Sequence, residues 1–225
     1  MLNEMYVLMD FSENFLKRSI TAAILTLVFL TANILYFETF LVLLVVSLIA
    51  LLKEWWELSA KLNGYLRRSV IGFFWFAPAL FALGWLRYVY GASPVLWAVS
   101  IVVASDVAAY FCGRTFGKRK IFPLISPGKT WEGFLGGLTA AGVVGVVLGI
   151  ILGGDWAAGG VLVALLTSIA GVIGDLTESY VKRCAGVKDS GQILPGHGGV
   201  LDRLDSHLFG LPIFVVGVMM IGWPT

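Results

Sequence analysis

Long apolar stretches separated by short polar ones dominate the pattern of this chain. Helices that cross a bilayer need about 20 predominantly apolar residues, and the stretches that approach this length are Ser19–Phe37, Thr39–Leu52, Val70–Leu86, Pro94–Cys112, Phe134–Leu152, Trp156–Gly174 and Leu208–Trp223. Their apolar residues follow one another without alternating with polar ones, which favours helices over the strands of a membrane barrel. The pattern predicts an all-α, polytopic membrane protein with about seven transmembrane helices.

The composition supports the same class. Hydrophobic residues make up 58% of the 225 residues, and the mean hydropathy is +0.88. Water-soluble domains rarely carry so much apolar sequence. Because no soluble domain and no repeat is visible, we predict one integral membrane domain over residues 1–225. It divides into N-terminal helices in 1–92 and a part expected to carry the chemistry in 93–225, with polar loops at 113–130 and 174–205.

The distribution of basic residues predicts the orientation. If the N-terminus is cytoplasmic, every Lys and Arg except Arg87 falls on the cytoplasmic side of the predicted helices. This asymmetry is what the positive-inside rule describes for short loops. We therefore predict a multi-pass protein of the cell (inner) membrane whose loops 113–130 and 174–205 face the cytoplasm, where nucleotides are available.

The segment from Gly174 to Asp205 holds an unusual density of charge for a chain with only 13% charged residues. If a helix continues through its first part, side chains at i, i+3, i+4 and i+7 share one face; these are Asp175, Glu178, Ser179 and Lys182. A glycine-rich turn follows, and then Asp202 and Asp205 share a face at the start of the last helix. We expect the two faces to meet if the intervening loop folds back.

Clustered carboxylates without soft ligands suit a hard cation such as Mg²⁺, and neighbouring Lys and Arg side chains suit phosphate oxygens. The alternative interpretation is a solvated loop whose charges form surface ion pairs of little consequence. The order of glycines, one histidine and acidic residues in the segment favours a binding site over that alternative.

Asp106 lies inside the fourth apolar stretch, and an intramembrane carboxylate is usually functional. A structural ion pair with a neighbouring helix is the alternative. In the basic loop 113–130, Ser126 and Lys129 are candidate contacts for substrate phosphate. A nonspecific patch for anionic lipid is the alternative there. The glycines at 133, 137, 145 and 149 are better interpreted as helix-packing positions.

Four groups of residues together resemble the signature of the phosphatidate cytidylyltransferases, also called CDP-diacylglycerol synthases: Ser179-x-x-Lys182-Arg183, Lys188-Asp189, Pro195-x-His197-Gly198-Gly199 and Asp202-Arg203-x-Asp205. The similarity extends upstream through Ser105-Asp106 and Ser126-Pro127-x-Lys129-Thr130, so that it covers roughly Ala104 to Leu208. Many members of that family carry more helices before the equivalent of Asp106. We expect this difference to leave the site untouched.

The resemblance implies transfer of the cytidylyl group of CTP to phosphatidic acid, which gives CDP-diacylglycerol and pyrophosphate in phospholipid biosynthesis. The lipid phosphate would attack the α-phosphorus of CTP with the help of Mg²⁺, and a second cation such as K⁺ is plausible. The partners are then CTP, phosphatidic acid and the lipid bilayer, with no nucleic acid. A homodimer is what the family suggests.

The same resemblance distributes the roles. Asp175 and Asp202 are the expected metal ligands, with Glu178 and Asp205 in support, and the expected catalytic set is Asp175, Asp202, Lys182, Arg183, Lys188 and Arg203. The expected substrate-binding set is Asp106, Ser126, Lys129, Ser179, His197, Gly198 and Gly199. His197 could donate to a phosphate oxygen, or it could only fix the glycine turn through a backbone hydrogen bond.

Two other functions compete. A transporter could also hold an intramembrane aspartate, but its polar residues would follow a path across several helices, whereas here nearly all lie on one side. An enzyme that uses CTP on a different lipid, such as a polyprenol kinase, is harder to distinguish. The product separates the two enzymes, because a kinase releases CDP and a cytidylyltransferase releases pyrophosphate.

Overall fold

The computed structural model describes residues 2–62, 71–153, 157–194 and 198–222. In these residues the chain forms seven helices and one two-stranded antiparallel hairpin. The elements are α1 (Leu2–Ile34), α2 (Phe37–Ser59), α3 (Ile71–Tyr90), α4 (Ala92–Phe116), β1 (Lys120–Phe122), β2 (Ser126–Thr130), α5 (Trp131–Gly153), α6 (Ala157–Cys184) and α7 (Leu201–Ile221). The all-α class predicted from the apolar pattern is therefore confirmed.

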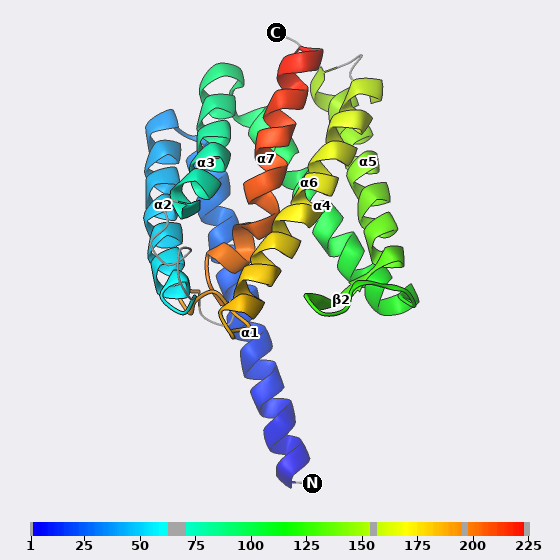
Figure 1. The fold of residues 1–225 in the computed structure, drawn as a ribbon. Helices are drawn as coiled ribbons and strands as arrows, with labels where there is room; N and C mark the ends of the chain where they lie inside the picture. Colours follow the sequence, from blue (N-terminus) through cyan, green and yellow to red (C-terminus); the bar gives the residue numbers. More distant parts are fainter. Residues whose placement is uncertain (1, 63–70, 154–156, 195–197, 223–225) are drawn as a thin grey trace.

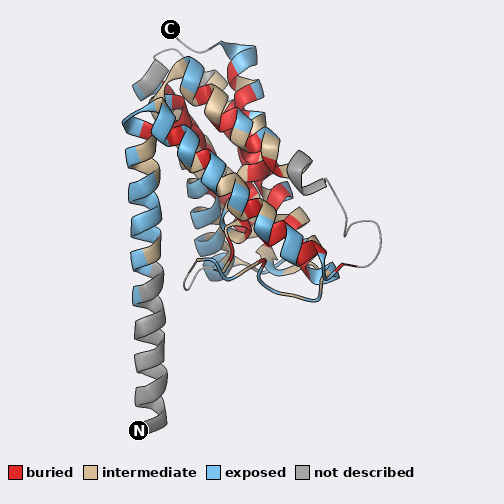
Figure 2. Cartoon of the chain, turned by 90° about the vertical axis from the view of Figure 1, so that its left-hand side faces the viewer, coloured by how far each residue is buried: buried red, intermediate tan, exposed pale blue. Residues whose placement is uncertain are grey.

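Four of these helices are long and apolar enough to cross a membrane: Ala92–Phe116, Trp131–Ile151, Gly159–Cys184 and Leu201–Ile221. Large apolar side chains are exposed along the outside of the helices, for example Ile49 and Ile151 (Figure 2). An outward apolar face needs no burial when lipid surrounds it. The protein is thus a multi-pass membrane protein, while the total of about seven spans and the side of the N-terminus stay predictions.

The helices form a bundle in which α7 lies between α2 and α3 on one side and α4, α5 and α6 on the other (Figure 1). The hairpin β1–β2 and the chain that joins α6 to α7 lie at the same end of this bundle. In the hairpin Lys120 pairs with Thr130 and Phe122 pairs with Ser126. The sequence pattern did not predict these strands within the loop 113–130.

Helices α6 and α7 both extend further into the polar segment than the apolar pattern indicated. Helix α6 continues past Gly174 to Cys184, and α7 begins at Leu201 rather than Leu208. The acidic residues at both ends of the segment 174–205 consequently lie on helices, where their directions are fixed, and the true loop is shorter than predicted.

Glycines let α5 pack closely against its two neighbours. A Cβ atom on Gly133 would lie 2.7 Å from the Ala109 carbonyl oxygen of α4, and one on Gly137 would lie 2.9 Å from that of Ser105. At the other end of α5, a Cβ on Gly145 would lie 2.7 Å from the Gly160 carbonyl oxygen of α6. The packing interpretation of these three glycines is confirmed.

A cluster of buried apolar side chains joins α2 and α3 to the first turns of α7. It contains Trp55, Phe76, Leu201 and Leu208 among others, and Leu201 is fully buried. Because Leu201 begins α7, this cluster holds the end of α7 that carries the acidic residues. The N-terminal helices therefore contact the part of the bundle where the chemistry was expected.

Candidate active site

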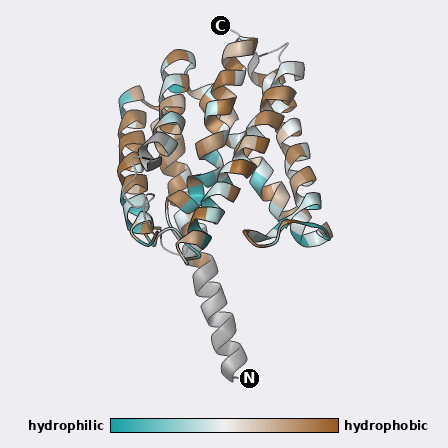
Figure 3. Ribbon diagram, viewed as in Figure 1, coloured by the Kyte–Doolittle hydropathy of each residue, from teal (hydrophilic) through white to brown (hydrophobic). Residues whose placement is uncertain are grey.

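A cavity of about 770 Å³ opens between α4, the hairpin, α5, α6 and α7. Its charged lining comes from the side chains of Asp106, Arg114, Lys120, Lys129, Asp175, Asp202 and Asp205. Apolar side chains, including Ala109, Ile121, Phe134 and Val172, line another part of its wall, together with hydroxyl-bearing residues and glycines. Hydrophilic residues gather where α6 and α7 approach the hairpin end of the bundle (Figure 3). The cavity combines oxygen ligands, cations and an apolar surface.

Several of the predicted site residues meet in this cavity although they lie far apart in the sequence. Helix α4 contributes Asp106, and the hairpin contributes Ser126 and Lys129. The carboxylates of α6 and α7 complete the set, so the two predicted acidic faces lie across one space. The roles of these residues stay predictions, but the structure confirms that the loop between α6 and α7 folds back and brings the two acidic faces together.

Lys182 of α6 lies behind the cavity wall, between two carboxylates. Its Nζ is 2.5 Å from Glu178 Oε2 and 2.7 Å from Asp202 Oδ1. Glu178 is fully buried, and Lys182 is nearly so. A buried cation between two acids satisfies both charges, and the loss of one member would leave the others uncompensated. Glu178 and Lys182 therefore fix Asp202 and do not line the cavity themselves.

Residues of the loop before α7 donate hydrogen bonds to Asp202. The Ser190 N–H donates to Asp202 Oδ2 at 2.9 Å, the Ser190 hydroxyl donates at 2.9 Å, and the Gly199 N–H donates at 2.8 Å. Gly198 has a φ of +82°, and a Cβ there would lie 2.8 Å from Asp202 Oδ2. The N–H groups of Ser190 and Gly199 thus bind a carboxylate of the protein itself, which holds Asp202 in one orientation.

Asp175 and Lys129 form an ion pair across the cavity, from α6 to the hairpin, with 2.7 Å between Nζ and Oδ2. Both side chains are partly exposed, and the Ser179 hydroxyl donates to Asp175 Oδ1 at 3.3 Å. On the opposite wall Asp106 accepts a 3.3 Å hydrogen bond from the Ser206 hydroxyl. The Ser206 N–H donates to Asp205 Oδ1 at 2.7 Å.

Other predicted residues lie outside the cavity lining. Arg183 donates to the carbonyl oxygens of Ile125 and Val187, so it ties the turn of the hairpin to the end of α6. Lys188 and Arg203 are exposed. His197 lies outside the described residues.

The donor chemistry of the cavity fits Mg²⁺. All of its acidic lining is aspartate oxygen, and neither His nor Cys is among the lining residues. Hard oxygen ligands are what this ion prefers. Among residues 2–62, 71–153, 157–194 and 198–222, however, no three acidic, His or Cys side chains stand together as a ready metal-binding group. Asp175 is paired with Lys129 and Asp202 with Lys182, so metal binding at either carboxylate would have to replace an ion pair.

Sequence reasoning missed three polar residues at the site, namely Glu54, Ser190 and Ser206. Glu54 of α2 is fully buried and accepts hydrogen bonds from the N–H groups of Val200 and Leu201, both at 2.8 Å. The N-terminal helices thus contribute a buried carboxylate next to the site. A charged residue directly after an apolar stretch could have indicated a buried site residue. In the sequence, however, Glu54 looks no different from Glu57, which is exposed.

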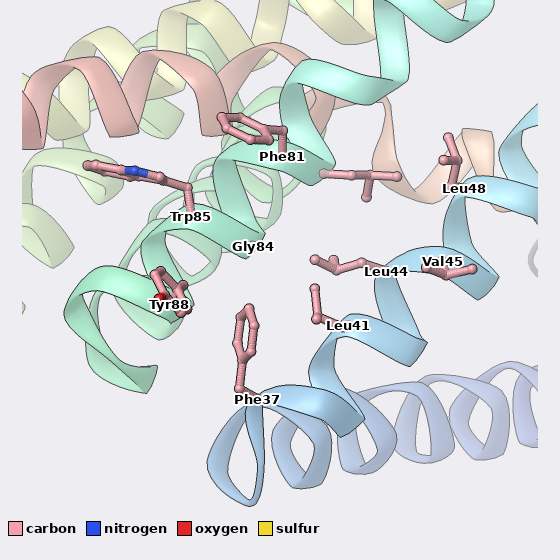
Figure 4. Close-up of a pocket in the computed structure, with 10 residues that line it drawn as sticks. Phe37, Leu41, Leu44, Val45, Leu48, Phe81, Gly84, Trp85 and Tyr88 are labelled. Atoms are coloured by element: carbon pink, nitrogen blue, oxygen red, sulfur yellow. The ribbon is translucent and has the colours of Figure 1, made fainter.

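A second hollow of about 370 Å³ lies between α2 and α3 (Figure 4). Its lining residues are apolar or aromatic and include Leu41, Leu48, Phe81 and Trp85, all on the two facing helices. No charged side chain lines this hollow. The charged cavity, by contrast, is lined by both acidic and basic side chains.

The fold and site define a helical membrane protein with an acidic, cation-compatible cavity, and the comparisons with known proteins agree with this class. A family model described as "Cytidylyltransferase family" matches residues 66–221, which is more than half of the chain. The protein belongs to that family. The matched residues include every charged group of the cavity, but Glu54 lies outside them.

Three phosphatidate cytidylyltransferases illustrate the similarity. The enzyme of Helicobacter pylori is 48% identical over 146 residues, which cover 63% of this chain and 53% of the relative. The enzyme of Haemophilus influenzae is 45% identical over 130 residues, covering 56% and 45%. The enzyme of Pseudomonas aeruginosa is 38% identical over 185 residues, covering 75% and 68%. The chain thus spans about half the length of the first two relatives.

Proposed function

We propose that this protein transfers the cytidylyl group of CTP to phosphatidic acid, forming CDP-diacylglycerol and pyrophosphate. The observation that carries the proposal is the meeting of Asp106, Asp175, Asp202, Asp205 and Lys129 in one cavity beside an apolar wall. Membership of the cytidylyltransferase family and the names of the relatives support the same reaction.

The chemistry needs positioning more than proton removal. The second pKa of a phosphate monoester is about 6, so the lipid phosphate is already largely ionised at neutral pH. An oxygen of that phosphate forms a bond to the α-phosphorus of CTP, and the bond from this phosphorus to the pyrophosphate breaks. Repulsion between the two anions is the main obstacle, so the site has to supply positive charge where they meet.

The cations of the cavity suit this task. Lys129, Lys120 and Arg114 line it from the hairpin and from the end of α4. We assign them to the phosphates of CTP and to the lipid headgroup, because Arg and Lys form charge-assisted hydrogen bonds with phosphate oxygens. Lys188 and Arg203 stay predicted phosphate contacts at the rim.

Asp175, Asp202 and Asp205 would hold Mg²⁺, with a second cation such as K⁺ as a further expectation. The ion would neutralise charge that develops on the departing pyrophosphate. The surrounding residues orient these ligands: Lys182 and the glycine turn hold Asp202, and Ser206 bonds Asp205. Lys129, released from Asp175 by metal binding, would become available to a phosphate.

The apolar wall of the cavity suits the second substrate. Val172, Phe134 and Ile121 lie beside the charged groups, so an amphiphile can place its headgroup among charges and its glycerol end against apolar side chains. We propose that this end of the bundle faces the cytoplasm, because the basic residues of the hairpin lie there and CTP is supplied from that side.

The deciding experiment is product analysis with the purified protein in lipid nanodiscs. Phosphatidic acid, Mg²⁺ and CTP labelled with ³²P at the α-phosphorus are supplied, and lipid and nucleotide fractions are separated. We expect the label in a lipid product and an equal amount of pyrophosphate. Asp202→Asn should lower the rate by at least about 100-fold, since one charge that positions the reacting groups is lost. Glu57→Gln, an exposed acid on α2, is the matched control and should keep the parent rate.

Other results would reject the proposal. Label that stays in CDP would indicate a CTP-dependent lipid kinase, and label in CMP without a lipid product would indicate hydrolysis. An Asp202→Asn variant with the parent rate would show that this cavity is not the active site.

A further inference from the structure

Glu54 places a buried carboxylate from the N-terminal helices at the start of α7. Its side chain is fully buried, and its two oxygens accept hydrogen bonds from successive backbone groups, Val200 N–H to Oε1 and Leu201 N–H to Oε2, each at 2.8 Å. These are among the first N–H groups of α7, which have no partner within their own helix. A carboxylate at this position satisfies them and complements the positive end of the helix dipole.

A side chain at the start of α7 itself does not do this. The N-cap residue is Val200, whose side chain forms no capping hydrogen bond. Helices usually begin with Ser, Thr, Asp or Asn, which supply such an acceptor from the same chain segment. Here the acceptor comes from another helix, so these two N–H groups at the start of α7 depend on α2 for their partner.

Two glycines make room for this carboxylate. A Cβ on Gly191 would lie 2.7 Å from Glu54 Oε1, and one on Gly199 would lie 2.6 Å from Oε2. A side chain at either position would therefore displace the Glu54 carboxylate. The loop before α7 is therefore built around Glu54 as well as around Asp202.

Ser190 connects Glu54 to the charged cavity. Its hydroxyl lies 3.4 Å from Glu54 Oε2 and 2.9 Å from Asp202 Oδ2, and its N–H also donates to Asp202. Asp202 and Asp205 lie in the first turns of α7, directly after the two N–H groups that Glu54 binds. A displacement of those turns would therefore move both cavity carboxylates at once.

From these contacts we infer that Glu54 is a positioning residue for cytidylyl transfer: it fixes the start of α7 so that Asp202 and Asp205 face the charged cavity. The inference rests on the proposed function. It assigns part of the site to the N-terminal helices and to a residue outside the segment that the family model matches.

The test compares Glu54→Gln with Glu57→Gln, an exposed neighbour on the same helix that loses the same charge. Steady-state rates are measured against CTP in nanodiscs, with the folded fraction of each preparation determined by size-exclusion chromatography. For Glu54→Gln we expect the KM for CTP to rise and kcat per folded molecule to fall, each by about tenfold, as is common when the support of a site residue is lost. Glu57→Gln should keep both constants.

Hydrogen exchange supplies a second measurement that needs no activity. The N–H groups of Val200 and Leu201 lose an ionised acceptor in Glu54→Gln, so peptides that contain them should exchange faster than in the parent. Peptides from α5 should not change. If Glu54→Gln does not fold, Ser190→Ala replaces it, since this variant removes the link to Asp202 and leaves both N–H bonds to Glu54. It should shift the KM in the same direction by a smaller factor.

An unchanged KM with a lower kcat that only follows the folded fraction would overturn the inference, because Glu54 would then be structural alone. Unchanged exchange at residues 200 and 201 would overturn it as well. Failure of the proposed function is distinguishable, since the parent protein itself would then form no cytidylylated lipid.

Discussion

The two hollows of this molecule differ in how their walls are built. The groove between α2 and α3 is bounded by large apolar side chains, and the glycine in its lining, Gly84, would accept a Cβ at 3.4 Å from Leu44, an ordinary contact. The charged cavity has glycines in its wall at which a Cβ would collide with backbone, as at Gly133. The groove depends on the bulk of its side chains, whereas the cavity depends on the close approach of main chains.

This difference bears on which hollow suits charged substrates. Close packing of the backbones gives side chains such as Asp106 and Asp175 well-defined starting positions, which helps to hold charged groups in one arrangement. The groove between α2 and α3 has no charged side chain in its lining, so no charge there orients a phosphate.

Among substitutions that test this difference between the cavity and the groove, Lys182→Met should have the largest effect on stability. The substitution leaves Glu178 and Asp202 buried without their cation, and breaking such a group destabilises a protein by about 3–5 kcal/mol. Thermal unfolding in detergent should show the loss, and activity should disappear with it. Lys188→Met removes an exposed lysine of the loop that follows α6 and should leave stability nearly unchanged. Equal unfolding temperatures for the two variants would contradict the role given to Lys182.

A smaller effect is expected from the glycines that distinguish the two walls. Gly133→Ala brings a methyl group within 2.7 Å of the Ala109 carbonyl oxygen, and overpacking of this kind costs about 1–3 kcal/mol of stability. Gly84→Ala has room and should be neutral or stabilising by up to about 1 kcal/mol, because alanine favours the helix. The unfolding temperatures of the two variants, measured under the same conditions, test this difference. A loss of the same size in both variants would break the comparison.

The smallest effect on stability is expected from Lys129→Gln. The ion pair with Asp175 is partly exposed, and pairs of that kind contribute about 1 kcal/mol or less. The effect should appear in the KM for CTP, which should rise about tenfold, since a hydrogen bond to a charged group contributes about 1.5–3 kcal/mol. Lys118→Gln, an exposed lysine before the hairpin, is the control. A parent-like KM in Lys129→Gln would remove this residue from substrate binding.

Much of the architecture could be predicted from the apolar pattern, because long uninterrupted apolar stretches have few alternatives to helices. The packing glycines of α5 and the shared face of Glu178 and Lys182 also followed from helical spacing. The ends of α6 and α7 were harder to predict, since polar residues continue a helix as readily as they end it. The hairpin at 120–130 has no long apolar alternation that would have revealed it.

The candidate site could be predicted as a set of residues but not as an arrangement. Spacing and resemblance identified Asp175, Asp202 and Lys182, yet only the fold shows that Lys182 lies behind the cavity and that Lys129 crosses it. Glu54 could not be found from the sequence, because its partners are backbone N–H groups that follow it by more than 140 residues. Nearly every residue type offers a backbone N–H, so a contact with the main chain requires no particular residue in the sequence.

The fit of Gly191 and Gly199 against Glu54 also constrains how this protein can change over evolutionary time. A Cβ at either glycine would lie within 3 Å of the Glu54 carboxylate, and one at Gly199 would also collide with the Ser190 hydroxyl. Substitution of either glycine would therefore displace the carboxylate that binds the start of α7. Positions 54, 191 and 199 should therefore covary among relatives. The N-terminal helices and the rest of the chain would then evolve together.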